Sequence, residues 1–309
     1  MTVPLKAAVI QMNSGADVKA NLAQARELLE QAAAAGAVLA TLPENCAFMG
    51  AHERDKLAHA EPDGAGPIQQ FLAATAARLK LWLLAGTLPI RADDEHVFAA
   101  SCLYNAEGAK VARYDKMHLF DVELPGSNGE RYRESKHITA GAATPVVTET
   151  PLGVLGLSVC YDLRFPELYR AQLARGATLL SVPAAFTAKT GAAHWHTLLK
   201  ARAVENQCFV LAAAQGGTHP GGRSTYGHSL ILGPWGETLA EVVRGSIKML
   251  RALGLFRLVQ AGFEIGTSFA DLLLEIPPRL AVSDVVKQIK GGSSRWIHET
   301  FPEMHAFHW

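Results

Sequence analysis

The sequence predicts a layered α/β sandwich, because helical and strand-like segments alternate along most of the chain. Short apolar runs of strand length, such as 6–12 and 38–42, alternate with segments of helical period such as 21–35. Two-stranded hairpin patterns interrupt this alternation at several points. The 309 residues suit one large domain, or one domain with an appendage, and no repeat of solenoid period is visible.

Start and stop signals place the elements in order. Gly36 ends the first helix in the position where a left-handed residue is favoured, and the strand 38–42 runs into Pro43 and Glu44. The second helix begins near Pro67 and reaches about Lys80. The further expected elements are a strand 81–87, hairpins 97–114, 146–159 and 227–243, helices 166–176 and 196–206, and strands 179–182 and 209–214. The polar stretch 115–143 is too long to be idle in a compact domain, so we expect a functional loop there.

Three reactive side chains end a predicted strand or follow one closely: Glu44, Lys116 and Cys160. Strand ends are where loops converge on a rigid scaffold, so a carboxylate, an ammonium and a thiol can meet there. The ammonium would lower the thiol pKa and stabilise negative charge. The carboxylate would accept the thiol proton and return it to a departing amine. This set predicts a cysteine-dependent amide hydrolase.

Seven segments occur in this order: LPENCAF, RYDKMHLFDVELPG, RESKHITAG, LSVCYDLRFPEL, GAAHW, ARAVENQ and YGHS. Together they resemble the nitrilase superfamily of carbon–nitrogen hydrolases, in particular its Nit branch of deaminated-glutathione amidases and ω-amidases. The similarity runs from Lys6 to about Gly245. It implies a four-layer α-β-β-α sandwich, often paired face to face as a homodimer, and hydrolysis that needs no metal or organic cofactor.

The resemblance also implies roles for individual residues. Cys160 matches the nucleophile, Glu44 the general base, and Lys116 the lysine of the family. Glu134 matches a second glutamate that positions the substrate or the water. The implied reaction passes through a thioester on Cys160, with the oxyanion held by Lys116 and by the backbone N–H of Tyr161.

Ordinary structural roles compete with these assignments. A lysine such as Lys116 is usually solvated, and Glu134 could simply pair with its basic neighbours. His194 and His196 invite a metal interpretation, but two positions apart on a helix is the wrong spacing for shared ligation, so no metal is expected. The residues expected to bind substrate or support the pocket are Tyr161, His194 and Trp195. The other cysteines, Cys46, Cys102 and Cys208, are expected in the core.

Bulk composition excludes several classes of partner. Lys+Arg and Asp+Glu both total 29, so no net charge draws the chain to nucleic acid or to an anionic membrane. The N-terminus lacks the pattern of a signal peptide, and the apolar runs are too short to span a bilayer. Four cysteines without a CxxC pair fit reduced thiols. We therefore expect a cytoplasmic protein whose partner is a small amide.

The sequence changes character after Gly245, so we expect a hydrolase domain 1–245 and a separate tail 246–309. The end of the tail, from LLLEIPP onward, resembles part of a tyrosine-type HUH transposase. That family expects a His-x-His metal pair before this strand, where the chain has Ser268 to Asp271, and a catalytic tyrosine further on. Transposase activity is therefore not expected. Our hypothesis is that a mobile-element fragment has replaced the native C-terminus. A missing final strand would expose a sheet edge or weaken a subunit interface.

The expected activity is cleavage of an amide in a small substrate that carries a carboxylate, as in a deaminated-glutathione amidase. An ω-amidase or another linear amidase is the nearest alternative. A protein that keeps the hydrolase fold but is inactivated by its altered C-terminus is the alternative from another class. A homodimer is expected if that C-terminus permits it.

Overall fold

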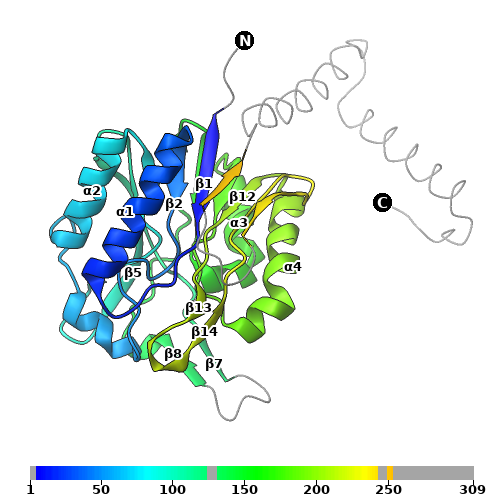
Figure 1. The fold of residues 1–309 in the computed structure, drawn as a ribbon. Helices are drawn as coiled ribbons and strands as arrows, with labels where there is room; N and C mark the ends of the chain where they lie inside the picture. Colours follow the sequence, from blue (N-terminus) through cyan, green and yellow to red (C-terminus); the bar gives the residue numbers. More distant parts are fainter. Residues whose placement is uncertain (1–4, 124–130, 243–248, 253–309) are drawn as a thin grey trace, which may run out of the picture. The chain divides into compact units, whose positions relative to one another are not determined.

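Two β-sheets lie at the centre of the structure, a computed structural model that describes residues 5–123, 131–242 and 249–252. The first sheet has the order β17-β1-β2-β3-β5-β4, and β6 pairs with β5. Its strands are β1 (Lys6–Ile10), β2 (Ala37–Thr41), β3 (Trp82–Leu84), β4 (Leu88–Arg91), β5 (Val97–Tyr104), β6 (Lys110–Asp115) and β17 (Met249–Ala252). Helices α1 (Val18–Ala34) and α2 (Pro67–Leu79) cover this sheet (Figure 1).

The second sheet has the order β16-β15-β12-β11-β10-β9. Its strands are β9 (Val147–Thr150), β10 (Gly153–Leu157), β11 (Leu179–Ser181), β12 (Phe209–Ala212), β15 (Leu230–Leu232) and β16 (Thr238–Glu241). Helices α3 (Pro166–Leu173) and α4 (Ala188–Asn206) cover it. Parallel pairing of β10, β11 and β12 places the carboxyl ends of these strands at one edge of the sheet.

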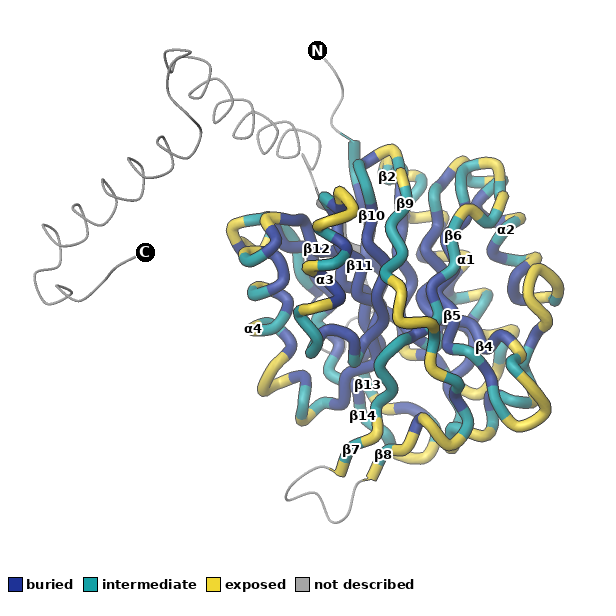
Figure 2. Tube along the Cα trace, turned by 180° about the vertical axis from the view of Figure 1, so that it is seen from behind, coloured by how far each residue is buried: buried dark blue, intermediate teal, exposed yellow. Residues whose placement is uncertain are grey.

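The side chains of a single strand point alternately to the two faces of its sheet, so one strand contacts both neighbouring layers. In β1, Ala7 and Val9 pack into the core shared with the second sheet, whereas Ala8 and Ile10 pack against α1 and α2. Successive side chains of a strand point to opposite faces, so a strand buried on both faces has a continuous apolar sequence. Figure 2 shows the resulting buried interior. The predicted four-layer α-β-β-α sandwich is confirmed.

Helix starts were the weakest part of the prediction. Helix α1 begins at Val18 rather than at residue 21, because the Asp17 carboxylate accepts the backbone N–H groups of Lys19 and Ala20. Helix α4 begins at Ala188, two turns before the expected start near His196, and the Thr187 hydroxyl caps it. The first turns of α4 have the sequence AKTGAAH, whose small and polar residues give no helical apolar stripe.

The stretch 115–143 contains secondary structure of its own. Strands β7 (Asp121–Glu123) and β8 (Arg131–Arg133) pair as an antiparallel hairpin, and a 3-10 helix (Glu134–Lys136) follows directly. Other short elements are the hairpin of β13 (Gly216–Thr218) and β14 (Ser224–Tyr226) and the 3-10 helices Glu53–His59, Cys160–Arg164 and Pro220–Gly222. These short elements surround the site described below.

Strand β17 continues the first sheet beyond Gly245. It pairs antiparallel with β1, with Ala252 opposite Ala7 and Met249 opposite Ile10. The edge of the first sheet beside β1 is therefore covered, contrary to the expectation of an exposed edge there. The residues 253–309 lie outside the described part of the chain, so a separate tail stays a prediction.

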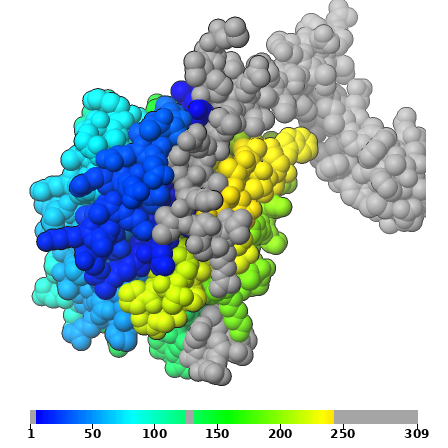
Figure 3. Space-filling view, in the orientation of Figure 1, coloured from blue at the N-terminus to red at the C-terminus, as the bar shows by residue number. Residues whose placement is uncertain are grey.

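The segment after β1 contacts the segment after β12. The ring of His219 hydrogen-bonds the carbonyl of Ser14 at 2.8 Å, and Gln215 hydrogen-bonds the backbone N–H and the hydroxyl of the same serine. Figure 3 shows the corresponding early and late segments of the chain side by side on the surface. These contacts join the first sheet to the loops of the second.

The surface gives two further observations. Among the described residues, no helix is both long enough and apolar enough to cross a membrane. The large hydrophobic side chains that remain exposed in this part of the chain are Val111, Val204 and Trp235. The expected homodimer stays a prediction.

Gly86 gives a test of the packing beside Glu44. Its φ is +63°, and a Cβ atom there would lie 1.9 Å from the carbonyl oxygen of Pro43. Gly86→Ala should therefore combine left-handed strain with overpacking and displace the segment that carries Glu44. Gly64, with φ +76° and no atom near its would-be Cβ, provides the control that carries strain alone. We expect Gly86→Ala to lower the free energy of unfolding in urea by about 1–3 kcal/mol more than Gly64→Ala does. Equal losses would contradict this account.

Candidate active site

Cys160 lies at a sharp turn after β10 and is the first residue of the 3-10 helix Cys160–Arg164. Its φ is +49°, a left-handed conformation that is costly for a residue with a Cβ atom and is often found at functional sites. The turn is held by two hydrogen bonds: Cys160 N–H donates to the carbonyl of Pro183 at 2.9 Å, and Val159 N–H donates to the carboxylate of Asp162 at 2.8 Å. The nucleophile predicted from the sequence is therefore held in a constrained conformation.

Glu44 follows β2 and is buried. One carboxylate oxygen lies 2.9 Å from Lys116 Nζ, and the other accepts the backbone N–H of Ala185 at 2.8 Å. The backbone carbonyl of Glu44 accepts a hydrogen bond from the Gln215 side chain at 2.9 Å. Contacts from both halves of the sandwich thus fix this carboxylate in place.

Lys116 follows β6 and has no exposed surface. Its ammonium lies 2.9 Å from Glu44 Oε1, 2.9 Å from Glu134 Oε1 and 2.7 Å from Glu134 Oε2. Glu134 also accepts the backbone N–H of Phe120 at 2.8 Å. Two carboxylates around one buried ammonium offset its lost hydration, and these contacts exclude the solvated interpretation of the lysine. They also show that Glu134 pairs with Lys116 rather than only with its basic neighbours.

Burial and these contacts determine the charges of Glu44 and Lys116. Burial alone would raise the pKa of Glu44, but the Lys116 ammonium and a hydrogen bond with the Cys160 thiol outweigh it, so this pKa lies below the ordinary value. Burial alone would lower the pKa of Lys116, but Glu134 and Glu44 raise it well above its ordinary value. At neutral pH the carboxylate and the ammonium are both charged.

The pKa of the Cys160 thiol is shifted upward, although from the sequence we expected Lys116 to lower it. Burial and the nearby Glu44 carboxylate raise the pKa of Cys160 well above its ordinary value, and Lys116 offsets this only in part. The expected lowering of the thiol pKa by the lysine is therefore outweighed. The resting thiol keeps its proton, so a base must remove it when the sulfur reacts. The Glu44 carboxylate and the thiol shift each other's pKa through charge and hydrogen bonding.

Asp162 joins the cysteine turn to the lysine loop, and the sequence interpretation missed it. The carboxylate is fully buried and accepts the Tyr114 hydroxyl at 2.8 Å, the backbone N–H of His118 at 3.0 Å, and the N–H of Val159. Tyr114 and His118 lie two residues before and after Lys116. This single side chain therefore sets the position of the thiol relative to the ammonium.

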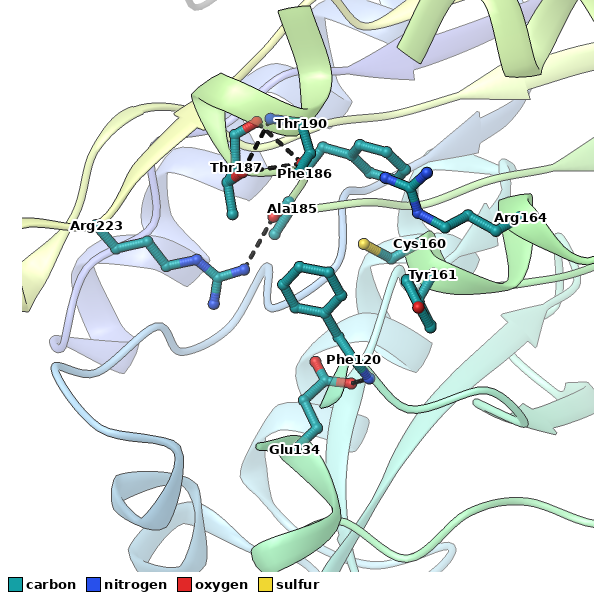
Figure 4. A pocket seen from close by; sticks show the side chains of 10 residues that line it. All are labelled: Phe120, Glu134, Cys160, Tyr161, Arg164, Ala185, Phe186, Thr187, Thr190 and Arg223. Atoms are coloured by element: carbon teal, nitrogen blue, oxygen red, sulfur yellow. Dashed lines mark hydrogen bonds between the residues drawn. The ribbon is translucent and has the colours of Figure 1, made fainter. Parts of the chain in front are cut away.

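A pocket opens above the Cys160 sulfur (Figure 4). Arg164 and Arg223 lie on opposite sides of it, and the sulfur points into the space between them. The lining residues are Phe120, Glu134, Cys160, Tyr161, Arg164, Ala185, Phe186, Thr187, Thr190 and Arg223. Two guanidinium groups beside a nucleophile make the pocket suited to a negatively charged substrate.

The three residues expected to bind substrate or support the pocket lie in different places. Tyr161 lines the pocket. Trp195 is fully buried behind it, with its ring centroid 4.9 Å from that of Phe186, and does not line it. His194 is exposed on α4, and its ring nitrogen lies 3.4 Å from a guanidinium nitrogen of Arg164. The roles of all three in substrate binding stay predictions.

Several pocket residues had no signal in the sequence. Arg223 lies in the turn before β14, far along the chain from Cys160, and donates to the carbonyl of Ala185 at 2.9 Å. Phe120 and Thr190 come from two further segments. Only tertiary packing brings these segments together, so periodicity and spacing could not have identified them.

Comparisons with known proteins agree with this geometry. The family model "Carbon-nitrogen hydrolase" matches residues 6–252. The deaminated glutathione amidase of Yersinia enterocolitica is 43% identical over 236 residues, which are 76% of this chain and 81% of that protein. The human deaminated glutathione amidase is 40% identical over 242 residues, which are 77% of this chain and 73% of that protein.

Solved structures have the same fold. The nitrilase–fragile histidine triad fusion protein NitFhit of Caenorhabditis elegans aligns with a TM-score of 0.77 and 37% identity, covering 87% of this chain and 65% of that one. A glutamate-to-glutamine mutant of an amidase from Nesterenkonia sp. AN1, with acrylamide added at its active-site cysteine, aligns with a TM-score of 0.68 and 28% identity. The alignment covers 80% of this chain and 92% of that one. A second family model, "Transposase IS200 like", matches residues 226–309.

Asp162→Asn tests whether Asp162 links the turn that carries Cys160 to the segment that carries Lys116. An amide can accept only some of the hydrogen bonds that the carboxylate accepts, so buried donors lose their partner. We expect kcat on an amide substrate to fall with little change in KM, and the free energy of unfolding to fall by about 1–3 kcal/mol. Steady-state kinetics and urea unfolding measure the two effects. Asp94→Asn, at an exposed carboxylate in the turn between β4 and β5, is the control. An Asp162→Asn variant with unchanged kcat would contradict the positioning role.

Proposed function

The chain belongs to the carbon–nitrogen hydrolase family, and from this premise we propose that it hydrolyses the amide of deaminated glutathione with Cys160 as its nucleophile. The observation that carries the proposal is the buried cluster of Glu44, Lys116 and Glu134 beside the Cys160 thiol. This cluster supplies a base, a cation and a second carboxylate at a sulfur that faces a pocket. We assign the four residues to catalysis.

The first half of the reaction forms a thioester. Glu44 takes the thiol proton as the sulfur attacks the amide carbonyl carbon. The resulting oxyanion is stabilised by the Lys116 ammonium and by the backbone N–H of Tyr161 at the start of its 3-10 helix. Glu44 then gives its proton to the amide nitrogen, the carbon–nitrogen bond breaks, and the amine leaves.

The second half of the reaction releases the acid. Glu44 removes a proton from a water molecule, which attacks the thioester carbonyl. The carbon–sulfur bond breaks, the acid leaves, and the sulfur recovers the proton from Glu44. Glu134 holds Lys116 through two oxygen contacts, so the ammonium keeps its place through both halves. The low pKa of Glu44 keeps this base ionised at neutral pH in the resting protein.

The substrate class follows from the two arginines and the relatives. Arg164 and Arg223 offer positive charge on both sides of the nucleophile, and deaminated glutathione carries a carboxylate on each side of its amide. Relatives that are deaminated glutathione amidases support this choice. An ω-amidase activity on α-ketoglutaramate is the alternative, since this smaller amide also carries a carboxylate.

The division of the chain is part of the proposal. We predicted a hydrolase domain 1–245 and a transposase-like tail 246–309, and we now propose a boundary after residue 252. The pairing of β17 with β1 and the family match to residue 252 support this later boundary.

Intact-protein mass spectrometry tests the nucleophile and the substrate together. Acid quenching during turnover stops hydrolysis of the thioester, so an acyl group on the sulfur is retained for detection. We expect an adduct of the α-ketoglutaryl mass on Cys160 in the quenched wild type with deaminated glutathione, and none in Cys160→Ala. Glu44→Gln lacks the base that activates the thiol, so it should form little or no adduct. Peptide mapping locates the adduct. Turnover by Cys160→Ala at the wild-type rate would rule the mechanism out.

Arg164→Gln tests recognition of the substrate carboxylate. Charge-assisted hydrogen bonds contribute about 1.5–3 kcal/mol, so KM for deaminated glutathione should rise roughly 10- to 100-fold. KM for the uncharged amide butyramide should change little. Arg170→Gln, at an exposed arginine on α3 that does not line the pocket, is the matched control. Equal effects of Arg164→Gln on both substrates would contradict a role in charge recognition.

A further inference from the structure

A second cluster of reactive side chains lies at the junction of α4 and the second sheet. It joins His196 of α4, His228 in the loop before β15, and Glu241 at the end of β16. His196 Nε2 lies 2.9 Å from Glu241 Oε1, and His228 Nδ1 lies 2.6 Å from the same oxygen. All three potential ligand atoms lie within 4.8 Å of one another. We refer to these residues as the His–His–Glu cluster.

The cluster is distinct from the Cys160 pocket and open to solvent. None of its members lines that pocket, and the residue that α4 contributes to the pocket lining is Thr190. The side chains of His196, His228 and Glu241 keep 32%, 18% and 29% of their surface exposed. An ion from solution can therefore reach the cluster without entering the catalytic pocket.

The two imidazoles are held in place by their surroundings. His228 has a left-handed φ of +55°, and its carbonyl accepts the indole N–H of Trp195 at 2.8 Å. The Tyr226 ring stacks on the His228 ring at 4.3 Å between centroids, and the His196 ring contacts both at its edge. These contacts aim one nitrogen of each imidazole at the Glu241 carboxylate. Such preorganisation lowers the entropy cost of binding a ligand there.

We propose that the His–His–Glu cluster binds a first-row divalent cation, best represented by Zn²⁺. Two imidazole nitrogens and one carboxylate oxygen are the donor set of many zinc sites, with water completing the coordination. In a tetrahedral site, metal–ligand bonds of about 2.0–2.2 Å place neighbouring ligand atoms roughly 3.3–3.6 Å apart. The nitrogen–oxygen separations of 2.9 and 2.6 Å are shorter than this spacing, and all three atoms lie within 4.8 Å of one another. An ion is therefore admitted when the carboxylate moves away from the imidazoles by about 1 Å or less.

From the sequence we considered only the pair His194 and His196 and expected no metal there. His194 and His196 lie two positions apart and cannot share an ion on one helix face, whereas Glu241 lies 45 residues beyond His196. The topology brings the three ligands together through α4, β15 and β16. A bound ion would tie the middle of α4 to the edge of the second sheet. Through Trp195 and Phe186 this part of α4 also supports the wall of the catalytic pocket.

Zinc binding by the full-length chain is the test. Cys160→Ala serves as the parent protein, because it removes the catalytic thiol as a zinc ligand. After dialysis against a chelator, isothermal titration with Zn²⁺ and metal analysis give the number of equivalents bound. We expect His196→Ala, His228→Ala and Glu241→Gln each to bind about one equivalent less than the parent. Co²⁺ should give a visible d–d absorption band in the parent that the three variants lose.

His96→Ala is the matched control. His96 Nδ1 lies 2.9 Å from Asp93 in an exposed imidazole–carboxylate pair without a third ligand in the described part of the chain, so its loss should leave zinc binding unchanged. Histidines outside the described residues that bind zinc would add equivalents that the three cluster substitutions leave in place. Circular dichroism checks that each variant is folded. Folded variants of the cluster that bind as much Zn²⁺ as His96→Ala would overturn the proposal, and the result is independent of amidase activity.

Discussion

The site depends on one buried ammonium. Lys116 has no exposed surface, and the lost hydration of its charge is offset only because Glu44 and Glu134 lie 2.7–2.9 Å away. The lysine therefore fixes both carboxylates as firmly as they fix it. Since Glu44 follows β2, Glu134 follows β8 and Lys116 follows β6, this ion cluster also locks three loops of the first half of the sandwich. The thiol comes from the second sheet, so the catalytic set exists only where the two sheets pack together.

Much of this arrangement could be predicted from the sequence. Glu44, Lys116 and Cys160 follow strands closely, and the convergence of strand ends together with the resemblance of their flanking segments to one family led us to expect them in one place. The alternation of strands with helices predicted a layered α/β sandwich, and the four-layer α-β-β-α arrangement was expected from the family resemblance. The start of α4 escaped prediction because its first turns have no apolar stripe, and β17 escaped because it lies beyond the segments that resemble the family.

What could not be predicted depends on tertiary burial. Burial raises the pKa of the Cys160 thiol and the Lys116 ammonium lowers it, so the direction of the shift depends on which effect is larger. Neither the depth of burial nor the distance to the lysine can be deduced from the spacing of residues in the sequence. Asp162 looks like an ordinary polar residue of a turn until the structure shows which donors surround it. The same holds for Arg223 and for the His–His–Glu cluster, whose members lie on separate elements.

The two family matches overlap on residues 226–252. The described residues of this overlap include β15 and β16 of the second sheet and β17 of the first, so these strands are part of the sandwich rather than of a separate module. The transposase-like similarity therefore begins inside the hydrolase fold. The pairing of β17 with β1 joins the latest described strand to the earliest one.

The hydrogen bonds that Glu44 receives have a consequence for biosynthesis. Its carboxylate is held by an N–H 141 residues away, and its backbone by a side chain 171 residues away. A nascent chain on the ribosome exposes Glu44 long before either partner has been translated. Such distant contacts form late and slow the search for the native state. Glu44 therefore reaches its final position only after the second sheet has been translated and has packed against the first. Incomplete translation products have no assembled hydrolase centre.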